Sequence, residues 1–281
     1  MSRVTARRPT LRLTAHGRVA RPDTLAVEEP LEIRLGGESL TVTMRTPGAD
    51  IDLVHGFLLS ENIIGGAEDI LAARYCAGVD EQGHNTYNVL DVDLRVPVTA
   101  RPRGFLTSGA CGLCGKTALE EVRVHTRHPL PEPAPLVTTS TLAEMPRTLR
   151  ARQTVFDATG GLHAAGLFTA DGVPLVVRED IGRHNAVDKV LGWALRENRV
   201  PAHDLVLIVS GRASFELVQK AVMAGAPLLG AVSAPSSLAV DLAADAKLTL
   251  VGFLRGDTMN VYTGRDRLAI DHLDAERTAA V

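Results

Sequence analysis

The sequence predicts an α/β protein in two parts, a smaller α+β domain followed by an α/β domain whose sheet is covered by helices. The length of 281 residues suffices for two domains. Residues 31–45 have the pattern of a β-hairpin, with alternating apolar residues on either side of Gly36 and Gly37. In the last 120 or so residues, strand-like segments alternate with helix-like ones, which is typical of βαβ units and of a largely parallel sheet.

The chain begins with six arginines and no acidic residue in residues 1–22. We expect residues 1–24 to form a flexible basic arm that is either without regular structure or loosely docked on the rest of the protein. The proline-rich segment 129–135 marks the boundary between the two domains, which gives domains at 25–135 and 136–268 and a tail at 269–281. The elements expected in the first domain are the hairpin 31–45, a helix capped by Asp50, short strands near 71–77 and 87–96 in mainly antiparallel pairing, and a helix over 116–125.

The second domain contains nine expected elements that alternate along the chain. Apolar runs of strand length are separated by amphipathic segments of about ten residues or more. The expected strands are 164–170, 173–179, 204–210, 226–233 and 247–253, and the expected helices are 141–152, 183–198, 213–224 and 236–245.

Ligands of such sheets bind at the carboxyl ends of parallel strands, which here are followed by residues 179–189, 210–216 and 233–239. Each of these segments has Gly, Ser or Arg where a helix begins, and helix N-termini attract phosphate. Ser210, Ser214 and Ser236 can equally be simple helix caps. Arg183 and Arg212 favour phosphate binding, because guanidinium groups bind pyrophosphate well. The candidate binding residues at these ends are Arg183, His184, Asn185, Lys189, Ser210, Gly211 and Arg212.

Four of the polar residues in segment 179–189 share helix faces in pairs. His184 lies four residues before Asp188, and Asn185 lies four residues before Lys189. One interpretation is a solvated polar face with one intrahelical pair; the other is a ligand site, since the cluster begins at a strand end. The sequence leaves both open.

The segment 252–264 leaves a strand through Arg255, Gly256 and Asp257 and returns as a second strand-like run. A plain hairpin turn needs no further function. A ligand-binding loop would present backbone N–H groups, one guanidinium and one carboxylate to a purine or a phosphate. Both interpretations fit the residues.

Cys111 and Cys114 form a Cys-x-x-Cys pair within the glycine-rich stretch "TSGACGLCGK". A structural zinc site requires four ligands, and no second such pair accompanies this one. A zinc deaminase would also need a His-x-Glu motif and a proline before the pair, and both are missing. A thiol–disulfide enzyme would hold the pair after a strand at set geometry, whereas this pair follows a long glycine-rich loop.

Sulfur transport is the third interpretation of this pair. It requires a nucleophilic thiolate, access to a bulky donor, and reach to a second site. Glycines provide reach, and the expected helix from Lys116 provides positive potential for the thiolate. The remaining cysteine, Cys76, is expected to be a buried small apolar residue.

The composition excludes several classes of function. A net charge of −3 gives no indication of nucleic-acid binding. No apolar run approaches the roughly 20 residues that span a bilayer, and the residues after Arg7 and Arg8 lack the apolar core of a secretory signal, so we do not expect secretion. Three cysteines do not make a disulfide framework, so we expect a cytoplasmic protein without membrane attachment.

Five motifs occur in an order that resembles one known family. They are "SGACGLCGK", "REDIGRHNAVDKVLG", "LIVSGRASFELVQKA", "VSAPSSLAVDLA" and "LTLVGFLRGDTMNVYT". Together they are similar to the formate dehydrogenase accessory sulfurtransferase family (FdhD/NarQ), from about residue 25 to 268. The resemblance implies a homodimer with a three-layer, cytidine-deaminase-like C-terminal domain.

The resemblance also implies a function. A cysteine desulfurase would place sulfur on Cys111 as a persulfide, with Cys114 as its partner, for transfer to the molybdenum bis-guanine-dinucleotide cofactor of formate dehydrogenase. No permanently bound metal is implied. Two rival hypotheses are a cofactor chaperone without sulfur chemistry and a zinc-dependent nucleotide hydrolase. The cofactor-binding residues that the resemblance implies are Phe253, Leu254, Arg255, Gly256, Asp257 and Thr258.

Overall fold

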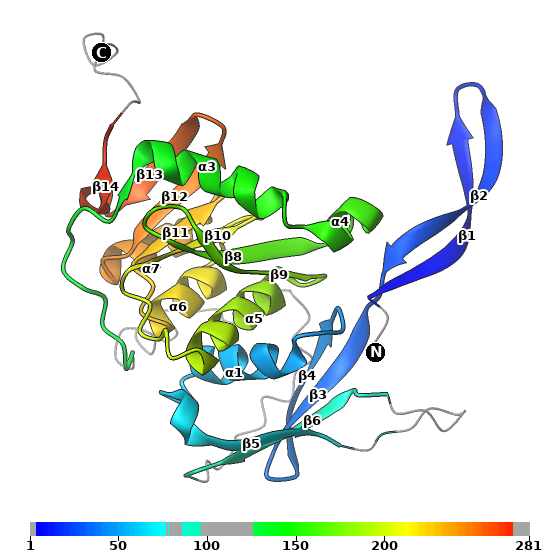
Figure 1. Cartoon of the computed structure of the whole chain (residues 1–281), viewed down its shortest axis with the longest axis horizontal. Helices are drawn as coiled ribbons and strands as arrows, with labels where there is room; N and C mark the ends of the chain where they lie inside the picture. The colour runs from blue at the N-terminus through cyan, green and yellow to red at the C-terminus, as the bar shows by residue number, and fades with distance from the viewer. Residues whose placement is uncertain (1–3, 77, 79–85, 97–125, 272–281) are drawn as a thin grey trace.

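The computed structural model describes residues 4–76, 78, 86–96 and 126–271, and these form successive layers (Figure 1). Helix α3 (Thr139–Arg150) covers one face of a six-stranded sheet. Helices α5 (Arg183–Arg196), α6 (Phe215–Met223) and α7 (Ser237–Asp245) cover the other face. Helix α1 (Asp50–Ser60) lies between α5 and a four-stranded sheet.

The six-stranded sheet has the order β13–β12–β11–β10–β8–β9. Its strands are β8 (His163–Thr169), β9 (Pro174–Asp180), β10 (Leu205–Val209), β11 (Leu228–Ala231), β12 (Thr249–Arg255) and β13 (Thr258–Thr263). Every strand and helix expected in this part is confirmed within a few residues.

The expectation of a largely parallel sheet is wrong. Only the pairs β10–β11 and β11–β12 are parallel, and the other three pairs are antiparallel. Short turns join β8 to β9 and β12 to β13, and a connection of a few residues permits only antiparallel neighbours.

Alternate residues of the central strands supply the two halves of the core. Val206 and Ile208 of β10 face α3, whereas Leu205, Leu207 and Val209 face the layer of α5, α6 and α7. The side chains thus alternate between two buried faces. Because both faces are buried, the strands are continuous apolar runs in the sequence and show no alternation of polar and apolar residues.

The four-stranded sheet has the order β4–β3–β6–β5. It contains β3 (Glu29–Leu35), β4 (Glu38–Arg45), β5 (Ile70–Tyr75) and β6 (Val89–Leu94), so the expected hairpin and both short strands are confirmed. The pairs β3–β4 and β5–β6 are antiparallel, and β3–β6 is parallel. Smaller elements are α4 (Thr154–Thr159), the paired β7 (Val137–Thr138) and β14 (Leu268–Ala269), and the 3-10 turns Ala67–Asp69 and Arg265–Arg267.

Asp50 does not cap α1 as expected. The N-cap residue is Ala49 in the left-handed conformation, with φ of 53° and no side-chain cap bond. Asp50 is instead the first helical residue, and its carboxylate accepts a bond of 3.0 Å from Nη2 of the fully buried Arg45. The Asp50 carboxylate therefore neutralises a buried guanidinium and does not cap the helix. Leaving that buried charge unpaired would cost free energy of folding.

Helices α1 and α5 touch through their backbones at two glycines. A Cβ at Gly56 would lie 1.9 Å from the carbonyl oxygen of Asp188, and a Cβ at Gly192 would lie 1.8 Å from that of Asp52. Both distances are shorter than any real contact, so only glycine permits this crossing. The crossing of α1 and α5 therefore fixes how the helix beside the four-stranded sheet packs against the helix beside the six-stranded sheet.

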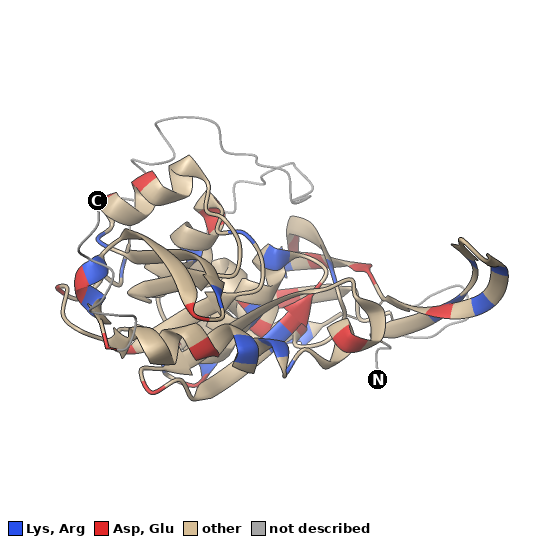
Figure 2. Ribbon diagram, turned by 90° about the horizontal axis from the view of Figure 1, so that it is seen from above, with Lys and Arg blue, Asp and Glu red and all other residues tan. Residues whose placement is uncertain are grey.

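The N-terminal residues form a regular hairpin, which corrects the expectation of an arm without regular structure. Strand β1 (Thr5–Thr14) pairs antiparallel with β2 (Gly17–Ala26) along their full length. This arm projects from the body in both views (Figures 1 and 2). The many arginines and two prolines hid the strand pattern, because few apolar residues alternate there.

Candidate functional site

A cavity of about 720 Å³ lies at one end of the six-stranded sheet, between α3 and the turn that joins β12 to β13. This volume is within the range of small-molecule sites. Four predicted binding residues line it: Ser210, Leu254, Arg255 and Gly256. The other lining residues are Ala143, Glu144, Pro146, Arg147, Leu149, Arg150, Gln153, Phe156, Gly160, Gly161, Leu162, His163 and Val232.

The β12–β13 turn is held in an irregular conformation beside this cavity. Phe253 has a φ of 50° and Gly256 a φ of 52°, and the register shifts between Gly252 and Arg255. Such irregularities re-aim side chains near binding sites. Leu254 is buried in the core, while Arg255 reaches back so that its Nε donates to the Val232 carbonyl at 2.8 Å.

The remaining residues of the turn point to solvent. Phe253 is 40% exposed, and Asp257 and Thr258 are exposed as well. The Thr258 hydroxyl donates to the Arg255 carbonyl at 3.1 Å, which closes the turn. The structure therefore brings Leu254, Arg255 and Gly256 to the cavity, whereas Phe253, Asp257 and Thr258 do not line it.

Helices α3 and α4 supply the opposite wall, which the sequence motifs do not reveal. Arg150 pairs with Asp157 at 2.6 Å and stacks over the Phe156 ring at 4.7 Å. Arg147 is exposed and its Nε donates to Glu144 at 2.7 Å. The wall thus combines an aromatic ring with two guanidinium groups, a composition suited to a flat heterocycle carrying phosphates.

Glu179, at the end of β9, fixes the position of α4. Its carboxylate oxygens accept bonds from the backbone N–H groups of Val155 at 2.9 Å and Phe156 at 2.7 Å. A negative charge at this place satisfies free N–H groups of the first helical turn. One acidic side chain from the sheet therefore holds the aromatic wall in position.

Four groups that are or can be cationic gather beside the cavity. Burial lowers the pKa of His163, and the nearby charges of Arg183, His184 and Arg212 lower it further. The Nε atom of Arg183 is buried without a hydrogen-bond partner. His184 is less free to bind a ligand, because its Nε2 lies 2.6 Å from the Glu216 carboxylate. We call His163, Arg183 and Arg212 the basic edge.

The three predicted helix caps differ in their roles. Ser236 caps α7, since its hydroxyl accepts from the N–H of Ala239 at 3.2 Å. Ser214 precedes α6 but makes no side-chain cap bond. Ser210 accepts instead from the N–H of Ala164 at 2.9 Å, which ties the end of β10 to β8. Gly211 lies beside His163, where a Cβ would come within 3.3 Å of Nδ1.

Asn185 and Lys189 lie inside the protein, so the solvated polar face, one of the two interpretations that the sequence left open, does not apply to them. The Lys189 ammonium lies 2.7 Å from Asp180 Oδ2 and donates to the Thr46 carbonyl at 2.8 Å. Asn185 donates to the Met44 carbonyl at 2.7 Å. These bonds join α5 to β9, to Met44 within β4 and to Thr46 just after β4, and they connect the two parts of the fold.

A second buried pair lies on another side of α5. Asp188 accepts bonds from Lys220 of α6 at 2.7 Å and from the Ser60 hydroxyl of α1 at 3.0 Å. Burial raises the pKa of Asp188, while the Lys220 ammonium opposes that rise. Three helices therefore meet at one carboxylate.

Comparison with known proteins identifies the family. The model of the FdhD/NarQ family matches residues 26–269. The chain belongs to this family. A protein from Nocardia farcinica named sulfur carrier protein FdhD is 77% identical over 95% of both chains. A protein of the same name from Mycolicibacterium paratuberculosis is 60% identical over 94% of this chain and 99% of its own length.

A solved structure has the same fold as this FdhD/NarQ chain. It is the crystal structure of a candidate formate dehydrogenase accessory protein from Desulfotalea psychrophila. The TM-score is 0.74 at 24% identity, with 95% of this chain and all of that chain covered.

The cysteine pair of this FdhD/NarQ chain, Cys111 and Cys114, lies outside the described residues, as does the helix expected over 116–125. Cys76 is described and is partly exposed, so the expectation that it is buried is wrong. Among the described residues, no three His, Cys, Asp or Glu side chains gather as a metal site. Within the same residues, no helix is long and apolar enough to cross a membrane.

Proposed function

We propose that this protein carries sulfur as a persulfide on Cys111, from a cysteine desulfurase to the molybdenum bis-guanine-dinucleotide cofactor, before the cofactor enters formate dehydrogenase. The observation that carries this proposal is the family match over residues 26–269, together with near-full-length relatives that are named sulfur carriers. The cavity beside Arg255 supports it, because the cofactor-binding segment that the resemblance implies forms one wall. The protein is then a sulfurtransferase.

Loading begins when the Cys111 thiolate attacks the terminal sulfur of the persulfide on the desulfurase. A bond forms between that sulfur and Cys111 Sγ, the sulfur–sulfur bond of the donor breaks, and the donor cysteine leaves as a thiolate. No electrons enter or leave this exchange. A Cys-x-x-Cys pair favours the thiolate form that attacks.

Delivery requires two electrons, because the carried sulfur must leave as sulfide. In our proposal the Cys114 thiolate attacks Cys111 Sγ, a disulfide forms between the two cysteines, and the terminal sulfur departs with the bonding pair to the metal of the bound cofactor. A cellular dithiol then reduces the disulfide and restores both thiols. In this proposal Cys114 is the resolving cysteine that releases the sulfur carried on Cys111.

The cavity would hold one guanine nucleotide arm of the cofactor. Phe156 and the stacked Arg150 offer a flat surface to a base, and Arg255 and the basic edge offer positive charge to its phosphates. Asp257 at the outer edge of the turn could accept from the N–H groups of guanine. Asn185 and Lys189 are buried in bonds between the two parts of the fold, so in this proposal they do not contact the nucleotide.

Mass spectrometry after incubation with a cysteine desulfurase and cysteine tests the sulfur chemistry. We expect an adduct of about 32 Da on Cys111, absent in Cys111→Ala and retained in Cys114→Ala. Cyanide should release the sulfur as thiocyanate. If the wild-type protein takes up no sulfur, it is a cofactor chaperone and the carrier proposal is wrong.

Calorimetry with guanosine diphosphate tests the cavity. Arg255→Ala should weaken binding about tenfold to a hundredfold, because one charge-assisted phosphate bond is lost. Arg265→Ala is the matched control, since Arg265 is exposed and does not line the cavity. Equal affinities of the two variants would remove Arg255 from the site.

The proposal also covers the cellular location, the oligomeric state and the partners of this protein. We place the protein in the cytoplasm as a homodimer that binds a desulfurase and formate dehydrogenase, without nucleic acid or membrane attachment. The α3, six-stranded sheet and α5–α7 layers would correspond to a cytidine-deaminase-like domain.

A further inference from the structure

The β1–β2 arm presents two long strands with little of the protein beside them (Figures 1 and 2). All but a few residues near its root are exposed. A two-stranded hairpin alone is only marginally stable in water, because it buries little apolar surface. An arm with 10-residue strands therefore gains stability from a surface that covers it.

Strand pairing sorts the side chains of the arm onto two different faces. Residues directly opposite each other share a face, and successive residues alternate. One face, which we call the apolar face, contains Pro9, Leu11, Leu13, Ala20 and Pro22, together with Arg7 and Arg18 and the small residues Thr5, Thr24 and Ala26. The opposite face contains Arg8, Arg12 and Arg21 with Asp23, and its larger apolar residues are Val19 and Leu25. Leu11 is 55% exposed and Leu13 is 71% exposed, so the apolar face is available for contact.

The arm is built to bind through a face and not through an edge. Pro9 stands directly opposite Pro22 in the ladder. Prolines can face each other only where no ladder bond is made, so their missing N–H groups belong to the outer edges of both strands. An incoming strand would lack a donor there on either side.

Charge indicates which surface covers the arm. The six arginines of residues 1–22 leave 24 basic and 33 acidic residues in the rest of the chain, whose formal charge is therefore −9. A basic arm and an acidic body in one chain complement each other between two copies. We infer that the apolar face of the arm docks on the body of a second copy of this chain. The inference rests on the proposed homodimer and assigns the surface that forms it.

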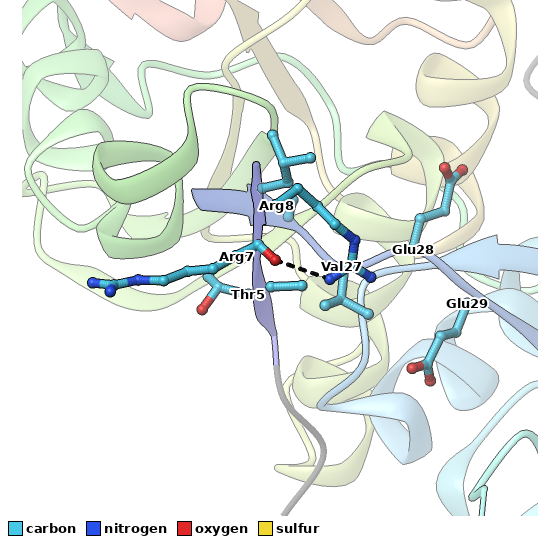
Figure 3. A pocket seen from close by; sticks show the side chains of 9 residues that line it. Thr5, Arg7, Arg8, Val27, Glu28 and Glu29 are labelled. Atoms are coloured by element: carbon cyan, nitrogen blue, oxygen red, sulfur yellow. Dashed lines mark hydrogen bonds between the residues drawn. The ribbon is translucent and has the colours of Figure 1, made fainter. Parts of the chain in front are cut away.

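The root of the arm adds a recess to this surface. A cavity of about 750 Å³ is lined by Thr5 to Arg8 of β1 and by Leu25 to Glu29 where β2 leads into β3 (Figure 3). Arg8 donates from Nη1 to the Arg7 carbonyl at 3.0 Å, and the carboxylates of Glu28 and Glu29 lie on the other side. Side chains of the second copy can enter this recess and extend the contact beyond the apolar face.

Sedimentation velocity of the full chain over a range of concentrations tests the inference. The variant Leu11→Thr/Leu13→Thr keeps residues that favour strands but removes most of the apolar face. We expect its dimer dissociation constant to rise at least about tenfold, because two leucines lose their burial. The matched control is Val19→Thr, the same kind of change on the opposite face of the arm at 59% exposure. It should change the constant less than about twofold.

Salt provides a second measurement. Raising the ionic strength from about 0.05 to 0.5 M should weaken the dimer, because screening removes the attraction between the basic arm and the acidic body. A dimer insensitive to both salt and the double variant overturns the role of the arm but leaves the homodimer standing.

A wild-type protein that stays monomeric at tens of micromolar overturns the inference together with the homodimer. A monomer that uses its arm only to bind the desulfurase overturns it as well. Because sulfur uptake on Cys111 is measured separately, none of these results decides the sulfur-carrier proposal.

Discussion

Replacing Lys189 by methionine tests whether this side chain joins the two parts of the fold or binds the cofactor. The Lys189 side chain is 2% exposed, and its ammonium lies 2.7 Å from the carboxylate of Asp180, which is fully buried. Its other bond goes to the carbonyl of Thr46, in the segment after β4. We therefore expect Lys189→Met to lower the free energy of unfolding and to leave guanosine diphosphate affinity unchanged.

The size of the loss follows from what happens to Asp180. Removing one partner of a buried ion pair costs about 3–5 kcal/mol. The carboxyl can instead take up a proton, which at pH 7 costs about 4 kcal/mol from an ordinary pKa. Protonation thus limits the loss to about 4 kcal/mol, or roughly 10 °C in Tm for a chain of this length.

The same reasoning sets a pH dependence for Lys189→Met. Burial already raises the pKa of Asp180, and the Lys189 ammonium opposes the rise, so the variant should raise it further. The folded variant would then hold a proton that the unfolded chain releases above about pH 4. Its deficit relative to wild type should grow with pH, from about 1.5 kcal/mol at pH 5 to about 4 kcal/mol at pH 7.

Urea unfolding at pH 5 and pH 7, with calorimetry of nucleotide binding, measures both quantities. The control is Asp180→Asn/Lys189→Met, in which the buried position no longer carries a charge, so most of the stability should return. A Lys189→Met protein with wild-type stability and lost nucleotide binding would refute our assignment and make Lys189 a ligand group.

Two further predictions concern the glycine crossing and the cavity. Gly192→Ala should lower Tm by about 5 °C or more, because its Cβ must move more than about 1 Å away from the Asp52 carbonyl. Gly161→Ala should not, because its Cβ would meet only the Thr159 carbonyl oxygen, at 3.9 Å. Calorimetry should show that guanosine diphosphate binds more tightly as pH falls from 8 to 6, by up to about tenfold per pH unit, since the lowered pKa of His163 leaves it a proton to gain beside phosphate. His163→Gln should remove that slope, and an unchanged slope would exclude His163.

Much of the fold could be predicted because the central strands are continuous apolar runs. The central residues of segments such as 204–210 and 226–233 are buried on both faces of the sheet, and an apolar run of that length between turn residues favours a covered strand over a helix. Strand direction could not be predicted in this way, because turn length and not composition sets it at β9 and β13. The β1–β2 hairpin could not be predicted, because its arginines and prolines do not have the sequence pattern of a strand. Its two strands are joined by backbone hydrogen bonds, which leave no such pattern.

Of the candidate site, likewise, only a part could be predicted from the sequence. Arg255 and Gly256 could be found because they belong to one contiguous motif at the end of a strand. Arg150 and Phe156 come from α3 and α4, which reach the cavity only through packing across the sheet. No local pattern marks such residues, since their common position is a property of the tertiary structure.

The buried polar residues of α5 connect the stability of the fold to the geometry of the site. Buried ion pairs add little net stability over apolar packing, but each permits only one arrangement of its partners. Lys189 and Asp188 therefore select one orientation of α5 against the segment after β4 and against α1 and α6. Because Arg183 begins the same helix, that orientation also sets where the basic edge lies relative to the cavity. Because the Asp188–Lys220 pair and the glycine crossing remain when Lys189 alone is replaced, that orientation should persist in Lys189→Met, and for this reason we expect its guanosine diphosphate affinity to stay unchanged.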